Sequence, residues 1–255
     1  MTNQSISATP VPLERILGMR DAHRREMSCQ IVRDAWHGRG FTASYELLVG
    51  DEIVGYGSVG GSPGDPPETL MEFFVLPEHR GMALPLFKQL VAASGARRVD
   101  AQTNDRLLLL MLLDCAVDVS SDTILFADGR TTTLPPPDTQ AILRRVTEAD
   151  ARVVFEHTME PVGSWGLEVD DRLVATGGQL FHYNPPYGDL FMEVAVPYRR
   201  RGFGSYLIQE LKRLSYEAGS IPAARCDANN IGSRRTLERA GMFPCGRMLR
   251  GRLMV

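Results

Sequence analysis

Three consecutive arginines (199–201) and two glycines, Gly202 and Gly204, stand between an apolar stretch and an amphipathic one. Residues 189–196 are apolar and rich in β-formers, which predicts a buried strand. Residues 205–219 carry leucines at helical spacing, which predicts a helix. The first amides of a helix have no intrahelical partner, and glycine lets an anion approach the backbone closely. This order predicts a pyrophosphate site, with an ordinary turn bearing solvated arginines as the alternative.

The turn has the pattern R/Q-x-x-G-x-G/A at residues 199–204. Placed between a strand and a helix, this pattern resembles the signature of the GNAT superfamily of acyl-CoA-dependent N-acetyltransferases. The resemblance implies that amides of the turn hold the pyrophosphate of acetyl-CoA, the acyl donor, and that the preceding strand pairs with its pantetheine arm. It assigns the following residues to the cofactor: Val194, Ala195, Val196, Arg199, Arg201, Gly202, Phe203, Gly204 and Ser205.

A second segment carries the same resemblance. Asn230, Ser233 and residues 234–243 are similar to the family segment N-x-x-S/A-x-x-l-Y-e-k-x-G-F, whose Asn touches the pantetheine. The resemblance therefore adds Asn230 and Ser233 to the cofactor residues, although Asn before a helix is also a common N-cap. The family often has a Tyr in this segment that protonates the leaving thiolate, and Leu237 stands at that position. The sequence therefore does not identify the general acid.

Glu193 is the candidate catalytic base. The family reaction is direct attack of an amine on the thioester carbonyl, and a neutral amine requires a group that takes a proton. Glu193 is an acid within a very apolar strand, where burial would raise its pKa. Exposure to solvent, or an ion pair with an arginine, is the alternative for this side chain.

The amine acceptor is expected near a Pro-bearing loop, residues 181–188, and near residues 157–165. His182, Tyr183 and Tyr187 are polar-tipped aromatic residues of that loop, so we assign them to the acceptor pocket. Packing within the loop is the alternative for all three.

The second half of the chain repeats the order of elements of the first half. The centres of two predicted hairpins, at residues 50–51 and 170–171, are 120 residues apart. Pro77 and Pro197, which follow corresponding apolar strands, have the same separation. A repeat of this length predicts two copies of one domain.

We therefore divide the chain into a degenerate GNAT-like domain (1–130), a Pro-rich linker (131–140) and a GNAT domain with the acyl-CoA site (141–255). The first copy is expected to lack strong CoA binding, because its turn is shorter and Pro85 removes an amide. The opposing interpretation is that the first copy has its own ligand. The predicted fold class is α/β (α+β), with two tandem domains that each hold a mixed, mostly antiparallel twisted sheet flanked by helices.

Composition limits the remaining function classes. Of the 255 residues, 44% are hydrophobic, which suffices for a core, and the net charge of −3 argues against nucleic-acid or membrane binding. The four cysteines form no CxxC pair and suit reduced thiols in a cytoplasmic protein. The histidines lack ligand-like spacing, so no metal is expected. No signal peptide is recognised, and the longest apolar run is too short to span a bilayer.

The N-terminal region carries weaker signals. Residues 1–12 are polar and are expected to form a loose arm. The pattern from Leu13 to Trp36 predicts one or two helices with a break near Asp21.

Together these features predict an acyltransferase of the GNAT type that moves an acetyl group from acetyl-CoA to a primary amine of a small molecule or peptide. The alternative is a non-catalytic acyl-CoA binding or sensing protein, which the missing Tyr favours. The acceptor's identity is not encoded in any recognised motif. The oligomeric state is left open, with a homodimer among the options.

Overall fold

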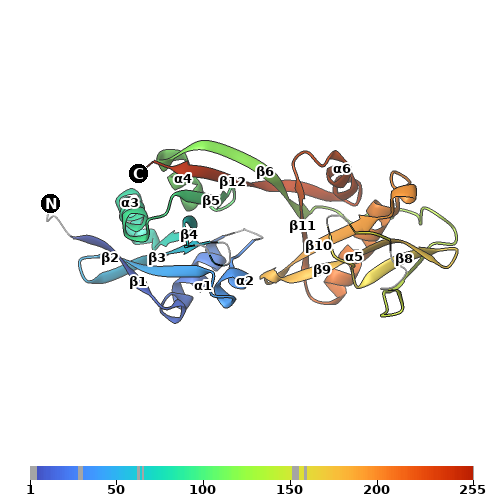
Figure 1. The fold of residues 1–255 in the computed structure, drawn as a ribbon, viewed down its shortest axis with the longest axis horizontal. Coiled ribbons are helices and arrows are strands. Elements are labelled where there is room, and N and C mark those ends of the chain that lie inside the picture. The colour runs from blue at the N-terminus through green and yellow to red at the C-terminus, as the bar shows by residue number, and fades with distance from the viewer. Residues whose placement is uncertain are drawn as a thin grey trace. The chain divides into compact units, whose positions relative to one another are not determined.

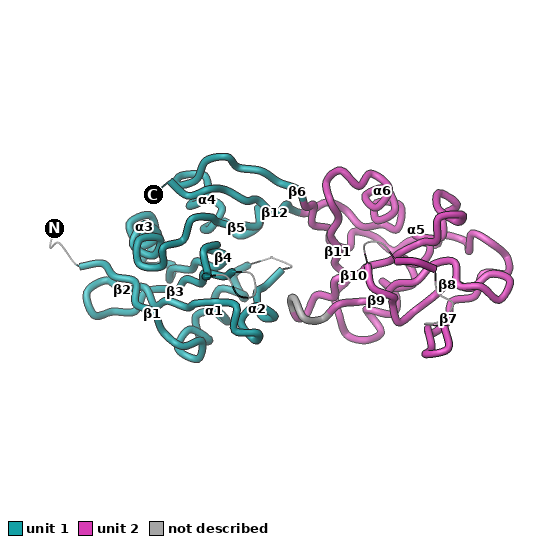
Figure 2. Tube along the Cα trace, in the orientation of Figure 1, with its two compact units in different colours: residues 1–122, 246–255 teal, residues 123–245 magenta. Residues whose placement is uncertain are grey.

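The computed structural model describes residues 5–27, 31–61, 64, 66–150, 155–157 and 160–254, without the side chains of 181–184. The chain divides into two compact units, one of residues 1–122 with 246–255 and one of residues 123–245 (Figure 2).

The elements of the first copy run in the following order: β1 (Ile6–Val11), η1 (Leu13–Arg15), α1 (Leu17–Glu26), α2 (Asp34–Gly38), β2 (Thr42–Val49), β3 (Glu52–Gly60), β4 (Thr69–Val75), η2 (Pro77–Met82), α3 (Ala83–Ser94), β5 (Arg98–Gln102), α4 (Arg106–Cys115) and β6 (Ala116–Asp128) (Figure 1). Those of the second copy are β7 (Ile142–Arg145), β8 (Trp165–Val169), β9 (Arg172–Asn184), β10 (Tyr187–Val194), η4 (Val196–Tyr198), α5 (Phe203–Glu217), β11 (Ile221–Asp227), α6 (Ile231–Arg239) and β12 (Met242–Leu253).

The first unit has a sheet in the order β1-β2-β3-β4-β5-β12-β6, and the second has β6-β11-β10-β9-β8-β7. The pairs from β1 to β4, β5–β12, β6–β11 and the pairs from β7 to β10 are antiparallel, whereas β4–β5 and β10–β11 are parallel. These mixed, mostly antiparallel sheets with flanking helices confirm the predicted fold class.

Two long strands each contribute to both units. The second half of β12 pairs with β5 in the first unit, with Met248 opposite Gln102 and Arg252 opposite Arg98. The second half of β6 pairs with β11 in the second unit, with Ala127 opposite Ala223. Each copy thus donates the end of its last strand to the other unit. The boundaries of the compact units therefore fall within β6 and β12. The division of the sequence into copies at residues 130 and 141 remains a proposal.

The repeat seen in the sequence reappears as matching backbone bonds. Leu76 donates its amide to the Val54 carbonyl at 2.8 Å, and Ala195 donates to the Val174 carbonyl at 2.9 Å. Both bonds join the end of one strand of a hairpin to its neighbour, just before the turn. The two copies therefore share their topology as well as their order of elements.

Apolar helix faces pack on one side of each sheet. In the first unit, Leu86 and Leu90 of α3 and Leu112 of α4 are fully buried in the core. In the second, Leu207 of α5 and Leu237 of α6 take the corresponding places. Periodic leucines explain these contacts, because residues three and four apart share a helix face.

Three expectations about local structure were wrong. Residues 6–11 form β1, which pairs with β2 because Ile6 and Ala8 pack on the core of the first unit, so they are no loose arm. Helix α1 continues through Asp21 and ends at Glu26. The expected loop 181–188 is mostly strand, because β9 extends to Asn184 and β10 begins at Tyr187.

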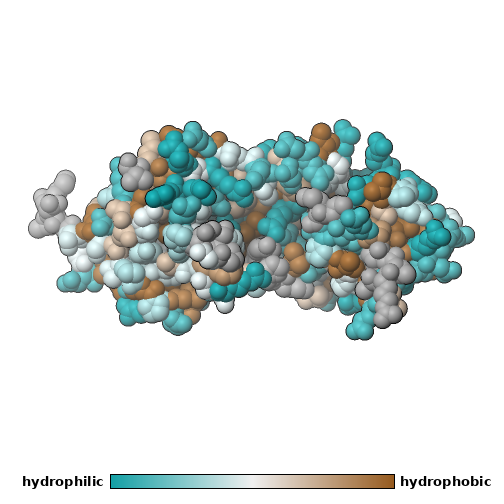
Figure 3. Space-filling model, in the orientation of Figure 1, coloured by the Kyte–Doolittle hydropathy of each residue, from teal (hydrophilic) through white to brown (hydrophobic). Residues whose placement is uncertain are grey.

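The surface mixes polar and apolar residues. On the face drawn in Figure 3, hydrophobic residues are scattered among hydrophilic ones. Among the described helices, none is long and apolar enough to cross a membrane.

Candidate active site

Strands β10 and β11 diverge in the second unit. They pair from Tyr187 opposite Ile221 to Leu190 opposite Ala224, and no further pairs follow. Strand β10 then continues unpaired on this side to Val194 and leads into the turn before α5. The separation leaves backbone groups of β10 free of strand partners beside the turn.

The turn presents unpaired amides. Gly202 is the N-cap residue of α5, and its φ of +97° lies in the region that favours glycine. No side chain caps the helix, and its first backbone bond runs from the Tyr206 amide to the Gly202 carbonyl at 3.0 Å. The amides of Phe203, Gly204 and Ser205 therefore have no helical acceptor and lie at the positive end of the dipole. This arrangement fits an anion such as a pyrophosphate.

Gly204 brings the first turn of α5 against its neighbours. A Cβ atom there would lie 3.1 Å from Thr236 Cγ2, 3.3 Å from Met192 Sδ and 3.5 Å from Val194 Cγ2. The start of α5 therefore packs closely against side chains of both β10 and α6. Phe203 is fully buried beside it and anchors the turn in the core.

The arginines of the turn contact the protein rather than solvent alone. Arg199 donates to a Glu193 carboxylate oxygen at 2.8 Å and to the Val194 carbonyl at 2.9 Å. The guanidinium of Arg201 lies over the rings of Tyr198 and Phe203, 5.3 and 5.5 Å from their centroids. These cation–π contacts hold Arg201 beside the turn, whereas Arg199 folds back onto β10.

The three strand residues assigned to the cofactor differ in what their backbones offer. The Ala195 amide is bonded to Val174, so it is not available to a ligand. Because backbone groups alternate along a strand, those of Val194 point towards the gap beside β11. Val196 begins η4 and is 71% exposed.

Glu193 lies on the sheet face opposite α5, together with a second acid. Glu193 and Asp189 are four residues apart on β10, share this face and are both buried. Arg225 of β11 lies 3.1 Å from an Asp189 oxygen. Burial raises the pKa of Asp189 to about 6, with the charge of Arg225 opposing the shift. Burial and the Asp189 charge also raise the pKa of nearby Glu160.

A segment before β8 crosses this same face. A Cβ on Gly163 would lie 2.1 Å from the backbone of Gly177. These two segments of the chain therefore pack closely because both positions are glycine. His157 Nε2 lies 2.6 Å from the hydroxyl of Thr176, which is directly opposite Glu193 in the β9–β10 register. The segment thus brings His157 next to the neighbour of the candidate base.

Asn230 and Ser233, which the sequence assigns to the cofactor, lie at the start of helix α6. The Asn230 side chain accepts from the Ser233 amide at 2.9 Å, so Asn230 is the N-cap. Burial raises the pKa of the Cys226 thiol, and nearby Ser233 opposes that shift. Leu237 is only 3% exposed and packs in the core, so this position offers no proton donor.

The acceptor residues assigned from the sequence are placed only in part. His182 and Tyr183 belong to β9, but their side chains lie outside the described structure. Tyr187 is half-buried at the start of β10 and shares the face of Asp189 and Glu193.

Sequence reasoning missed Asp189, Glu160 and Arg225. Asp189 carries the signal that singled out Glu193, an acid in an apolar strand, and the two-residue period puts both on one face. Glu160 and Arg225 come from other segments, and no local pattern in the chain predicts that they meet Asp189.

The first unit repeats part of this geometry. Arg80 donates to the Val75 carbonyl at 3.2 Å, as Arg199 does to Val194. Helix α3 also lacks a side-chain cap, but Pro85 lies in its first turn and removes an amide there. The first turn of α3 therefore offers fewer amides to an anion than the first turn of α5 does.

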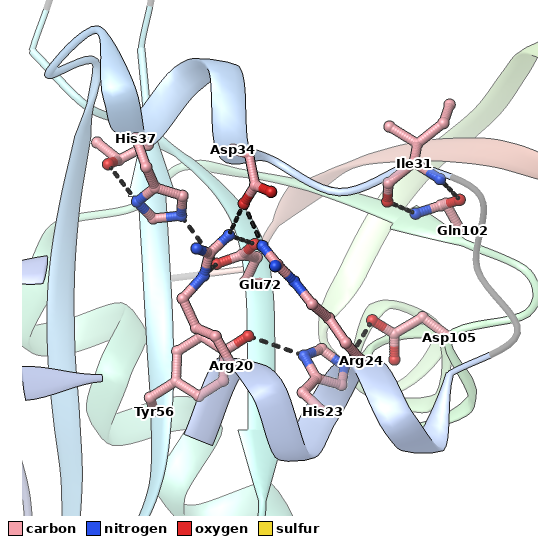
Figure 4. A network of polar contacts seen from close by, with 11 residues as sticks. Arg20, His23, Arg24, Ile31, Asp34, His37, Tyr56, Glu72, Gln102 and Asp105 are labelled. Carbon is pink, nitrogen blue, oxygen red and sulfur yellow. Dashed lines mark hydrogen bonds and ion pairs between the residues drawn. The ribbon is translucent and has the colours of Figure 1, made fainter. Parts of the chain in front are cut away.

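A buried polar network covers the sheet face opposite α3 in the first unit (Figure 4). Arg20 of α1 donates to both Glu72 oxygens, at 2.8 and 3.1 Å, and His37 Nε2 lies 2.9 Å from the same carboxylate. These contacts hold the pKa of Glu72 well below its usual range despite burial. The network ties α1 and α2 to β4, because each buried charge has a partner.

His23 links α1 to two other elements of the first unit. Its Nδ1 lies 2.9 Å from the Tyr56 hydroxyl, its Nε2 lies 3.4 Å from Asp105, and its ring stacks on Phe74. A cavity of about 200 Å³ beside it is lined by residues of α1, β4, η2 and the start of α4. His23 thus lies where β4 and β5 diverge and links β3, β4 and the segment after β5.

Family models match both halves of the chain. Residues 26–129 match an acetyltransferase (GNAT) domain, and residues 131–242 match the acetyltransferase (GNAT) family. The chain belongs to the GNAT acetyltransferase family. Its two GNAT domains in tandem confirm the resemblance seen in the sequence and indicate an acyltransferase. No curated protein matches the sequence.

Solved structures share this tandem GNAT fold over nearly the whole chain. An acetyltransferase from the GNAT family of Colwellia psychrerythraea has a TM-score of 0.75 at 14% identity, covering 97% of this chain and 100% of its own. A tandem GNAT protein from the clavulanic acid biosynthesis pathway has a TM-score of 0.61 at 12% identity, covering 97% and 98%. A GCN5-related N-acetyltransferase from Sphaerobacter thermophilus has a TM-score of 0.55 at 17% identity, covering 97% and 95%. At these identities the likeness shows the fold.

Among the described residues, no group of three or more His, Cys, Asp and Glu side chains is arranged to hold a metal ion.

Proposed function

We propose that this GNAT protein transfers an acetyl group from acetyl-CoA to a primary amine of a small molecule or peptide. The observation that carries the proposal is the start of α5, where three unpaired amides follow a glycine N-cap beside a diverging strand. An anion at this point gains amide donors without displacing any helical bond.

The residues of the second domain would hold acetyl-CoA as follows. The amides of Phe203, Gly204 and Ser205 would bind the pyrophosphate, with Arg201 held nearby as a cation. The Val194 amide would receive the pantetheine arm, because the Val194 carbonyl already accepts from Arg199. When bound, acetyl-CoA supplies the thioester carbonyl that the amine attacks.

Glu193 is proposed as the base that makes the amine neutral. It is buried at the end of β10, on the face crossed by residues 160–163. Its partner Arg199 balances its charge and fixes its position. A water molecule between Glu193 and the amine would carry the proton, since the carboxylate is held by the arginine.

Asp189 and Glu160 extend the row of carboxyl groups beyond Glu193, and Arg225 pairs with Asp189 there. We propose that the acceptor enters on this face, with Tyr187, His182 and Tyr183 contributing. Because a leucine side chain has no transferable proton, position 237 of α6 would not protonate the thiolate.

The first copy is proposed to be degenerate in CoA binding. Pro85 weakens its anion site, and His23 with Asp105 bridges its strand gap. The described cysteines form no disulfide with one another, which supports a cytoplasmic location. A homodimer stays part of the proposal without a structural argument.

Turnover of acetyl-CoA against a panel of primary amines tests the function. Release of free thiol is measured with wild-type protein and with Glu193→Gln. Amine-dependent release that the variant loses supports the proposal. Tight binding of acetyl-CoA with no turnover of any amine would contradict it.

A further inference from the structure

The linker segment (131–140) is bound along the second domain instead of spanning free space. The Leu134 amide donates to the Gln209 side chain at 2.7 Å, and Gln209 Nε2 returns a bond to the Leu134 carbonyl at 3.2 Å. The Thr132 hydroxyl donates to the Ala240 carbonyl at 3.3 Å. The segment therefore contacts α5 and the end of α6 at once.

A buried lysine fixes the chain just before this segment. Lys212 of α5 is 4% exposed, and its Nζ donates to the carbonyls of Arg130 at 2.7 Å and Ala240 at 2.8 Å. The same ammonium lies 2.6 Å from an Asp128 oxygen. The two carbonyls accept hydrogen bonds from the ammonium and the Asp128 carboxylate balances its charge, so this buried lysine is paired.

The far end of the segment reaches the anion-binding turn. A Cβ on Gly202 would lie 3.7 Å from Pro137 Cβ, which is ordinary contact distance. Pro137 is the last of three consecutive prolines, whose φ angles are restricted and whose nitrogens carry no hydrogen. The prolines therefore present a stiff apolar wall beside the glycine N-cap without competing for an anion.

We infer that the linker segment is one wall of the phosphate-binding turn and that Gln209 and Lys212 are positioning residues for acetyl-CoA. The inference rests on the proposed function. A wall already held in place lowers the ordering cost of binding, because the turn is restrained before the ligand arrives. Loss of the wall should therefore weaken binding and leave the chemical step unchanged.

The test uses the full chain and two variants that loosen the wall at different points. Gln209→Ala removes both bonds to Leu134, and Pro137→Gly removes the proline ring that lies beside Gly202. Arg213→Ala is the matched control, because Arg213 lies on the same helix in exposed ion pairs with Glu210 and Glu217. Calorimetry gives the Kd for acetyl-CoA, and steady-state kinetics give kcat at saturating acetyl-CoA.

Both wall variants should raise the Kd roughly fivefold with unchanged kcat, which corresponds to about 1 kcal/mol of lost preorganisation. Arg213→Ala should bind like wild type. If wild-type protein binds acetyl-CoA and both wall variants bind it with the same Kd as wild type, the inference is overturned. Failure of wild-type protein to bind acetyl-CoA would instead refute the proposed function.

Discussion

Replacing Gly202 with Val tests the anion-binding turn against a control within the same helix. Gly202 and Gly219 flank α5 and have φ angles of +97° and +77°. A Cβ would meet nothing within 4 Å at Gly219 and only Pro137, at 3.7 Å, at Gly202. Val at either position is strained by its backbone conformation rather than by collision, at a cost of about 1–3 kcal/mol.

The two variants should therefore lose similar stability but differ in binding. Strain at Gly202 shifts the amides of Phe203 to Ser205, and each lost bond to a charged phosphate costs about 1.5–3 kcal/mol. We expect the Kd for acetyl-CoA to rise at least about tenfold in Gly202→Val and to stay unchanged in Gly219→Val. Calorimetry measures the affinities, and urea unfolding measures both stabilities. Equal affinities of the two variants would refute the role of the turn.

Three further predictions concern buried charges. Glu193→Gln should lower kcat by about 100-fold or more because the amine loses the group that takes its proton, and an unchanged kcat would contradict this role. Because the Asp189 pKa is raised from 3.8 to about 6, the folded state holds this proton more tightly, so the stability contributed by the group should fall by about 2 kcal/mol as pH rises from 4 to 7. Urea unfolding of Asp189→Asn should show a smaller fall, and an identical pH slope would contradict this. Lys212→Met should cost about 3–5 kcal/mol because Asp128 is left buried without its partner, and adding Asp128→Asn should recover part of that loss in urea unfolding.

Local sequence patterns predicted the secondary-structure elements around the site. The apolar run of β10, the glycines at 202 and 204 and the leucines of α5 predict a strand, a turn and a helix, and each forms where its residues favour it. The repeat at 120 residues predicts the tandem arrangement for the same reason, because both copies use the same local signals.

Contacts between distant segments could not be predicted from local patterns. The pair of Arg225 with Asp189 depends on the parallel register of β10 and β11, and Lys212 meets Arg130 across 82 residues. The exchange of β6 and β12 between units depends equally on pairing over long separations. Residues 6–11 read as an arm because their partner strand, 42–49, lies far along the chain and supplies the bonds that make them a strand.

Hydrogen exchange with and without acetyl-CoA tests most directly whether the second domain holds the cofactor. The amides of Phe203 to Ser205 have no helical acceptor and should exchange fast in the free protein and slowly in the complex. The corresponding turn of the first copy, residues 77–85, should be unchanged. Protection of residues 77–85 without protection of 202–205 would contradict the account.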